Sequence, residues 1–129
     1  MSDTGYSAKP LIQKLGYEPS QTVYMHNPPE WFPEELALNN VTPSDNPEST
    51  WIHAFFTSQK ELDAFMDTFD PADTTKGVWV SWPKKSSGVA TDLTEQRFRD
   101  AILPTGWVDT KVCAIDETWS GLKFLRRKA

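Results

Sequence analysis

Apolar residues along this chain follow two alternating patterns, which indicate alternating strands and helices. Short apolar runs such as 51–56 and 78–82 are typical of strands buried between two layers. Between them, Leu62, Phe65 and Phe69 recur at helical spacing, directly after the capping-box sequence of residues 58–61. The order of these patterns favours an α/β fold.

Taken in order, the alternation predicts a three-layer α/β fold. Its sheet is mostly parallel, has about five strands and ends in a C-terminal antiparallel hairpin, with right-handed crossovers. All of residues 1–129 are expected to form a single domain, with residues 1–8 as a flexible N-terminal arm. The predicted strands are 22–26, 51–56, 78–82, 107–116 and 122–126, and the predicted helices are 10–15, 28–38 (or 33–38), 59–69 and 92–103.

Charge is distributed unevenly along the chain, which carries a net charge of −5. Residues 1–75 contain 3 basic and 12 acidic side chains, whereas residues 76–129 contain 10 basic and 6 acidic ones. This asymmetry fits solubility and attraction between the halves, or a local anion site in the second half. It disfavours non-specific nucleic-acid binding, which usually requires a strongly basic face.

Several features predict a cytoplasmic protein without a membrane segment. No apolar run approaches the ~20 residues of a membrane helix, and the N-terminus lacks a signal-peptide core. Cys113 is the only cysteine, so an internal disulfide is impossible.

A candidate site follows from the predicted sheet, because ligands of open α/β sheets bind beyond the carboxyl ends of parallel strands. The segments just past those ends should meet at one rim. The candidate ligand-binding residues of this rim are Asn27, Lys84, Lys85, Ser86, Ser87, Gly88, Asp116, Glu117 and Trp119.

Two interpretations of this rim remain open. In the first, backbone N–H groups of residues 86–88 and a lysine bind an anion, near the positive end of the helix that begins around Asp92. In the second, Lys84 and Lys85 pair with Asp116 and Glu117, and Asp92 only caps its helix.

The chemical motifs of common enzymes are weak in this sequence. Ser86 or Ser87 can be combined with His26 and Asp116 as a triad, but the GxSxG elbow is missing. An enzyme of unrecognised chemistry would use Lys84, Ser86 or Asp116, and it requires these side chains to converge in a pocket.

A metal site is not expected. His26, His53 and Cys113 are too few and lack the spacing of metal ligands. His53 is interpreted as a hydrogen-bonded core histidine, and Cys113 as a small buried hydrophobic residue.

The entry helix and strand of LIQKLGYEPSQTVYMHNP, together with the final hairpin, resemble the Rossmann-like methyltransferase fold in contracted form. That resemblance implies a glycine-rich cofactor loop after the first strand, where residues 26–30 contain no glycine. It also implies an acidic residue at the end of the second strand, for which the sequence shows no clear counterpart. The second and third strands are expected to be mostly deleted, so no cofactor is expected, S-adenosylmethionine included.

Two motifs carry a more specific resemblance. PKKSSGVATDLTE (83–95) and KVCAIDETWSGLKFLRR (111–127) resemble a family of small bacterial proteins known only as a domain of unknown function. The family implies a fold and no activity.

Together these observations predict a non-enzymatic binding or regulatory module. Its expected partner is an anionic small molecule or a protein, at the carboxyl-end rim of the sheet. The alternatives are the enzyme described above and residual S-adenosylmethionine binding. A free sheet edge also permits a homodimer.

Overall fold

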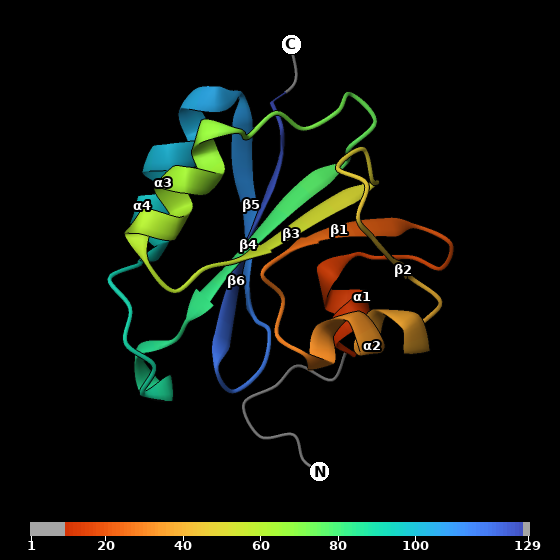
Figure 1. The fold of residues 1–129 in the computed structure, drawn as a ribbon, viewed down its shortest axis with the longest axis horizontal. Helices are drawn as coiled ribbons and strands as arrows, with labels where there is room; N and C mark the ends of the chain where they lie inside the picture. The colour runs from red at the N-terminus through yellow and green to blue at the C-terminus, as the bar shows by residue number, and fades with distance from the viewer. Residues whose placement is uncertain (1–9, 128–129) are drawn as a thin grey trace.

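The computed structural model describes residues 10–127, so the arm predicted for residues 1–8 lies outside the described part. One six-stranded sheet runs through it in the order β2-β1-β3-β4-β6-β5 (Figure 1). The first four strands in this order are parallel, and β6 and β5 are antiparallel to their neighbours. The strands are β1 (Thr22–His26), β2 (Thr42–Ser44), β3 (Trp51–Phe55), β4 (Gly77–Pro83), β5 (Trp107–Ala114) and β6 (Trp119–Arg126).

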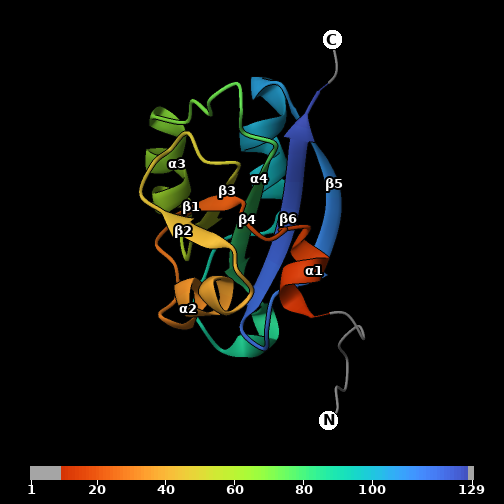
Figure 2. The ribbon, with the colours of Figure 1, turned by 90° about the vertical axis from the view of Figure 1, so that its right-hand side faces the viewer.

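Helices cover both faces of the sheet, and each face has its own apolar core. The helices α1 and α2 pack on one face, α1 near the β5–β6 end and α2 near β2 (Figure 2). On the other face α3 and α4 contact each other. None of the described helices is long and apolar enough to cross a membrane. The helices are α1 (Leu11–Leu15), α2 (Trp31–Leu38), α3 (Gln59–Asp67) and α4 (Glu95–Ile102), with two short 3₁₀ turns at Lys85–Ser87 and Leu103–Thr105.

The three-layer, mostly parallel α/β fold with its C-terminal antiparallel hairpin is confirmed. The sixth strand is β2, which is only three residues long and pairs with β1 at the edge of the sheet. Its polar, proline-containing sequence shows no hydrophobic strand pattern. Backbone pairing with β1, rather than burial of side chains, holds this strand in place. The second strand is therefore shortened and not lost, and Asp45 follows it directly.

Local capping explains where the helices begin. Ser58 Oγ accepts the N–H of Glu61, and the Glu61 carboxylate accepts the N–H of Thr57 at 2.6 Å, so the predicted capping sequence of α3 is confirmed. The predicted start of α4 at Asp92 is wrong, because Thr94 caps that helix. Asp92 instead accepts the N–H of Gln59 at the start of α3.

Pro33 lies inside the first turn of α2, which begins at Trp31 rather than at either predicted proline. A proline is tolerated there because N–H groups of the first turn have no partner within the helix.

No helix connects β2 to β3. Residues 45–50 link them directly, whereas α2, α3 and α4 each follow one of the parallel strands β1, β3 and β4. Parallel strands are usually joined by a helix that covers one face of the sheet. Beside β1, the sheet face that carries α3 and α4 therefore has an uncovered part.

Candidate functional site

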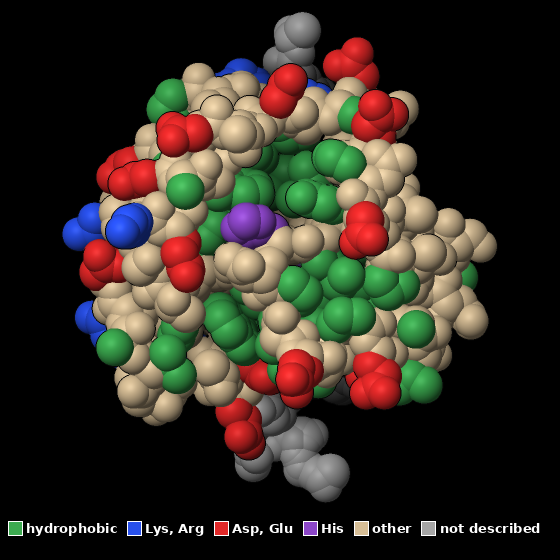
Figure 3. All heavy atoms as spheres, viewed as in Figure 1, with side chains coloured by type: hydrophobic (Ala, Val, Ile, Leu, Met, Phe, Trp, Pro, Cys, Tyr) green, Lys and Arg blue, Asp and Glu red, His purple; other side chains and the backbone are tan. Residues whose placement is uncertain are grey.

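A hollow of about 580 Å³ lies over that uncovered part, between β1 and α3. We call it the β1–α3 hollow. The space-filling view shows it as a depression with hydrophobic side chains inside and acidic ones around it (Figure 3). Its lining residues are Tyr24, His26, Asn27, Pro47, Ile52, Glu61, Ala64, Phe65, Thr68, Phe69, Asp70 and Pro71.

Two sequence periodicities build this lining. Tyr24 and His26 are two positions apart on β1, so they share one face of the sheet. On α3, Glu61, Phe65 and Thr68 are three or four positions apart and share one face of the helix. The aromatic stripe of α3 thus lines the hollow as well as packing against the core.

The charges of the hollow are acidic. Glu61 and Asp70 line it, and no lysine or arginine is among its lining residues. Glu61 is held in place, because its carboxylate accepts both the N–H and the hydroxyl of Thr57. An anion would therefore meet only repulsion from the charged side chains here.

His26 lies at the carboxyl end of β1, where it packs against aromatic rings. Its ring centroid is 5.0 Å from that of Phe65 and 5.5 Å from that of Phe56, and its Nε2 is 3.4 Å from the Asn27 amide nitrogen. Burial lowers the pKa of His26, and the charge of Glu61 opposes this effect only in part. The imidazole is thus neutral at pH 7 and can donate or accept a hydrogen bond.

The hollow extends to the position where this type of sheet usually binds ligands. The chain passes from β1 outward to β2 and then returns to β3 on the other side of β1, so the strand order reverses between β1 and β3. Ligands of open α/β sheets bind beyond the carboxyl ends of the strands at such a point. Asn27, with a φ of 53°, turns the chain there without a glycine, and it is the one candidate ligand-binding residue of the predicted rim that lines this hollow.

The predicted lysine-serine loop forms its own turn. Ser87 Oγ donates to the Lys84 carbonyl at 2.7 Å and accepts the N–H of Val89 at 3.1 Å. Gly88 ends the turn with a φ of 81°, a conformation that suits glycine. Ser86 and Lys85 are exposed on this turn.

The β5–β6 hairpin lies next to this loop, as the sequence predicts. The Lys84 N–H donates to the Thr118 carbonyl at 2.8 Å, and Trp119 pairs with Pro83. The Asp116 carboxylate instead accepts the N–H groups of Thr118 and Trp119 in its own turn.

The side chains of this neighbourhood do not form one polar cluster. The two ion pairs between described residues both involve Arg99, so neither Lys84 nor Lys85 pairs with Asp116 or Glu117 within that part of the chain. Nor does a hydrogen bond join the side chains of Lys84, Ser86 and Asp116. The expected convergence for an enzyme is therefore missing at this loop.

A second, shallower hollow of about 330 Å³ lies on the opposite face of the sheet and includes Asp116. His26 packs on the α3 face, so the Ser–His–Asp combination is divided between the two faces. Trp119 is half-buried and packs edge-on against Phe55, with 5.1 Å between ring centroids.

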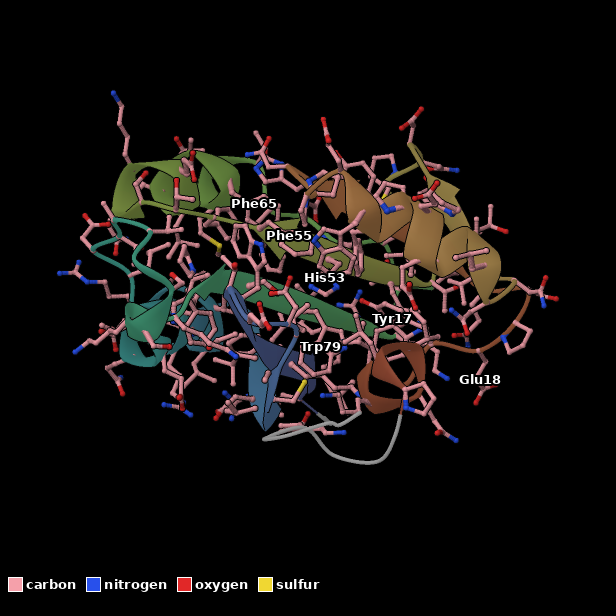
Figure 4. The ribbon with its side chains drawn as sticks, turned by 90° about the horizontal axis from the view of Figure 1, so that it is seen from below. Tyr17, Glu18, His53, Phe55, Phe65 and Trp79 are labelled. Atoms are coloured by element: carbon pink, nitrogen blue, oxygen red, sulfur yellow. The ribbon has the colours of Figure 1, made fainter. Side chains whose placement is uncertain are left out.

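His53 is a hydrogen-bonded core histidine, as predicted. Its Nδ1 is 2.8 Å from the Tyr17 hydroxyl and its Nε2 is 2.9 Å from the Ser81 hydroxyl, all three fully or almost fully buried. Figure 4 shows Tyr17, His53 and Trp79 between α1 and the sheet, with Phe65 on the other side. Cys113 is only half-buried, and burial raises the pKa of its thiol.

The sequence interpretation missed the lining of the β1–α3 hollow other than Asn27 and His26, and it considered His26 only as a member of a triad or as a metal ligand. The sequence pattern places Tyr24 on a predicted strand, and Phe65 and Phe69 on the apolar stripe of a predicted helix. One sequence signal was available: residues 45–50 are too short and too polar to supply a covering helix. A sheet face beside β1 must then lack cover.

Several solved structures resemble this fold, including the following three. A protein in the NADB-Rossmann superfamily from Streptococcus agalactiae matches with a TM-score of 0.58 and 6% identity, over 98% of this chain and 72% of that chain. Magnesium protoporphyrin IX methyltransferase (ChlM) from Synechocystis PCC 6803, solved with bound SAM, has a TM-score of 0.56 and 9% identity. The match covers 90% of this chain and 74% of that chain. The ribosomal protein L11 methylase from Lactobacillus delbrueckii subsp. bulgaricus has a TM-score of 0.52 and 12% identity. The match covers 92% of this chain and 76% of that chain.

At such low identities the likeness shows the fold alone, and it confirms a Rossmann-like, methyltransferase-like topology. No curated protein matches the sequence. A family profile does match, over residues 54–129, which is more than half of the chain. The chain therefore belongs to the family described as Domain of unknown function (DUF8412).

Proposed function

We propose that this protein is a non-enzymatic binding or regulatory module whose ligand occupies the β1–α3 hollow. The proposed ligand is a small molecule with a flat ring and a neutral or positive charge. The observation that carries this proposal is an aromatic, acid-lined hollow that reaches the β1–β3 reversal of the sheet.

The volume and lining of the hollow suit such a ligand. Small-molecule sites usually measure roughly 300–1,000 Å³ and combine an apolar lining with a few polar groups, and this hollow has about 580 Å³. Phe65 and Tyr24 offer ring surfaces for stacking, and a cation gains further attraction from aromatic faces. Glu61 and Asp70 add negative charge, while neutral His26 and Asn27 offer hydrogen bonds.

S-adenosylmethionine is a second candidate for the same hollow. ChlM, a structural neighbour, was solved with bound SAM, and the positive sulfonium group of this molecule suits the acidic lining. Asp45, directly after β2, stands where the resemblance implies an acidic residue. The glycine-free turn at residues 26–30 argues against this candidate, because backbone and cofactor would have to come close there.

Blocking the hollow tests both candidates. Ala64→Trp fills it from α3, and Ala37→Trp adds the same ring to an exposed alanine of α2 on the other face. We expect adenosine and S-adenosylmethionine to show saturable binding to the wild type in ligand-observed NMR and calorimetry. Ala64→Trp should abolish this binding, and Ala37→Trp should leave it unchanged.

Two charge variants separate the candidates. Asp45→Asn should weaken S-adenosylmethionine binding if that molecule is the ligand, and the exposed Asp63→Asn serves as its control. Binding of adenosine alone would support the neutral-ring ligand and reject the cofactor. Failure of both probes to bind, or equal binding by Ala64→Trp, would contradict the proposed site.

The lysine-serine loop remains a proposed site for an anionic small molecule or a protein partner. Its exposed Lys85 and Ser86 support this, and the absence of an ion pair to Asp116 or Glu117 leaves both lysines available in the described structure. Calorimetry with inorganic phosphate on the wild type and on Lys84→Ala/Lys85→Ala tests the small-anion version, and equal binding by the two proteins would reject it.

A further inference from the structure

Three lysines gather on the sheet face opposite the β1–α3 hollow. Lys123 Nζ is 5.1 Å and Lys76 Nζ is 6.0 Å from the ring centroid of Trp51, which is only 3% exposed. Lys111 is the cross-strand partner of Lys123 in the β5–β6 pairing. We call Lys76, Lys111 and Lys123 the lysine patch.

Contacts with α1 hold one member of the patch in place. Lys111 Nζ donates to the Lys14 carbonyl at 2.8 Å, in the last turn of α1. Lys123 Nζ lies close to Gly16, where an added Cβ would be 3.3 Å away from it. An ammonium group has three donors, so Lys111 retains two after this bond. The side chains of Lys76 and Lys123 make no hydrogen bond to the described protein.

The charge of the patch is not neutralised within the described residues. Both ion pairs between those residues belong to Arg99, so no carboxylate there pairs with the patch. Burial lowers the pKa of Lys123, and the positive charges of Lys111 and Lys76 lower it further. Like charges brought together without a counterion repel each other, and a bound anion would remove that repulsion.

We propose that the lysine patch binds the phosphate group of a small anionic ligand. Lysine is a common phosphate binder that acts as a point charge, and three ammonium groups, from β5, from β6 and from the residue just before β4, can contact different oxygens of one phosphate. Because Trp51 is buried beneath the lysines, the patch offers charge and donors rather than a stacking surface. This site is independent of the proposed hollow, which lies on the other face.

Pyrophosphate and inorganic phosphate are suitable probes. Their binding is measured by calorimetry and by NMR chemical shifts at constant ionic strength, because salt screens exposed charges. We expect saturable binding of pyrophosphate to the wild type, stronger than that of phosphate. Each lysine replaced removes one charged donor to the anion, so Lys111→Gln/Lys123→Gln should raise the Kd of pyrophosphate by about a hundredfold.

Two further variants keep the result interpretable. Lys76→Gln removes the charge of a side chain that makes no hydrogen bond in the described structure. It should therefore weaken pyrophosphate binding by about tenfold without disturbing the fold. Lys60→Gln removes one exposed lysine charge from α3, on the other face of the sheet, and should leave the Kd unchanged. No saturable binding by the wild type, or an equal Kd for the wild type and Lys111→Gln/Lys123→Gln, would overturn the proposal.

Discussion

At the scale of single residues, the buried Tyr17–His53–Ser81 network shows how the fold accommodates a titratable group. Both ring nitrogens of His53 have a hydroxyl partner, at 2.8 and 2.9 Å. Burial lowers the pKa of His53 to about 3. The histidine is therefore neutral in the folded protein throughout the ordinary pH range, and its hydroxyl partners satisfy it without a charge.

This burial predicts a loss of stability in acid. An unfolded histidine has a pKa of about 6.5, so between pH 6.5 and about 3 the unfolded chain binds one more proton at this position than the folded chain. The free energy of unfolding then falls as pH falls, by roughly 1.4 kcal/mol per unit once the pH is well below 6.5. Urea unfolding at pH 7, 5 and 4 measures this slope.

His53→Gln should reduce that slope by roughly 1.4 kcal/mol per pH unit, which corresponds to about one proton, whatever its effect on stability at pH 7. His26→Gln is the control, since His26 is only partly buried and should contribute less. Equal slopes for wild type and His53→Gln would show that another group causes the acid sensitivity.

At the scale of elements, α3 contributes both to the core and to the β1–α3 hollow. Ser58 and Glu61 cap its N-terminus, and Asp92 from the segment before α4 accepts the N–H of Gln59. The start of α3 is thus held by local and distant groups together. This firm start fixes the position of Glu61, and hence one wall of the hollow.

Ser58→Ala should destabilise the protein by about 1 kcal/mol, the usual cost of losing an N-cap side chain. Ser86→Ala, which changes an exposed serine of the lysine-serine loop, should have little effect. Chemical unfolding at pH 7 measures both. If the two variants were equally stable, the Ser58 cap would not contribute as its geometry implies.

At the scale of the whole molecule, α1 is tied to strands far along the chain. Trp79 Nε1 on β4 donates to the Leu15 carbonyl at 2.9 Å, and Tyr17 just after α1 bonds to His53 on β3. The α1 helix has only five residues, too few to be stable alone. Its structure therefore depends on these long-range bonds and on burial of Ile12 and Leu15.

Trp79→Phe should consequently destabilise the molecule more than Trp82→Phe. Both changes remove similar ring area, but only the first leaves the buried Leu15 carbonyl without its indole partner, which costs about 1–3 kcal/mol. Hydrogen exchange at α1 should also accelerate in Trp79→Phe. An equal loss of stability in both variants, with unchanged exchange at α1, would contradict this account.

Much of the fold could be predicted because periodicity and capping are local. The run 51–56 predicts β3, and the spacing of Leu62, Phe65 and Phe69 predicts α3. The same local reasoning assigned the α4 cap to Asp92, because the sequence does not show that Asp92 would bond to Gln59. Local patterns therefore determined the elements, and long-range contacts corrected their ends.

The candidate site depended on three-dimensional arrangement to a greater extent. The sequence by itself determined that Asn27 and the loop at residues 84–88 follow parallel strands, since order along the chain decides that. Only the tertiary structure decided that β2 returns to β3 without a covering helix, which opens the β1–α3 hollow beside Tyr24 and Phe65. It likewise decided that Lys111 and Lys123 pair across β5–β6 and that Lys123 approaches Trp51. The physical reason is that a hollow or a charge cluster arises from residues distant in sequence, which no local pattern records.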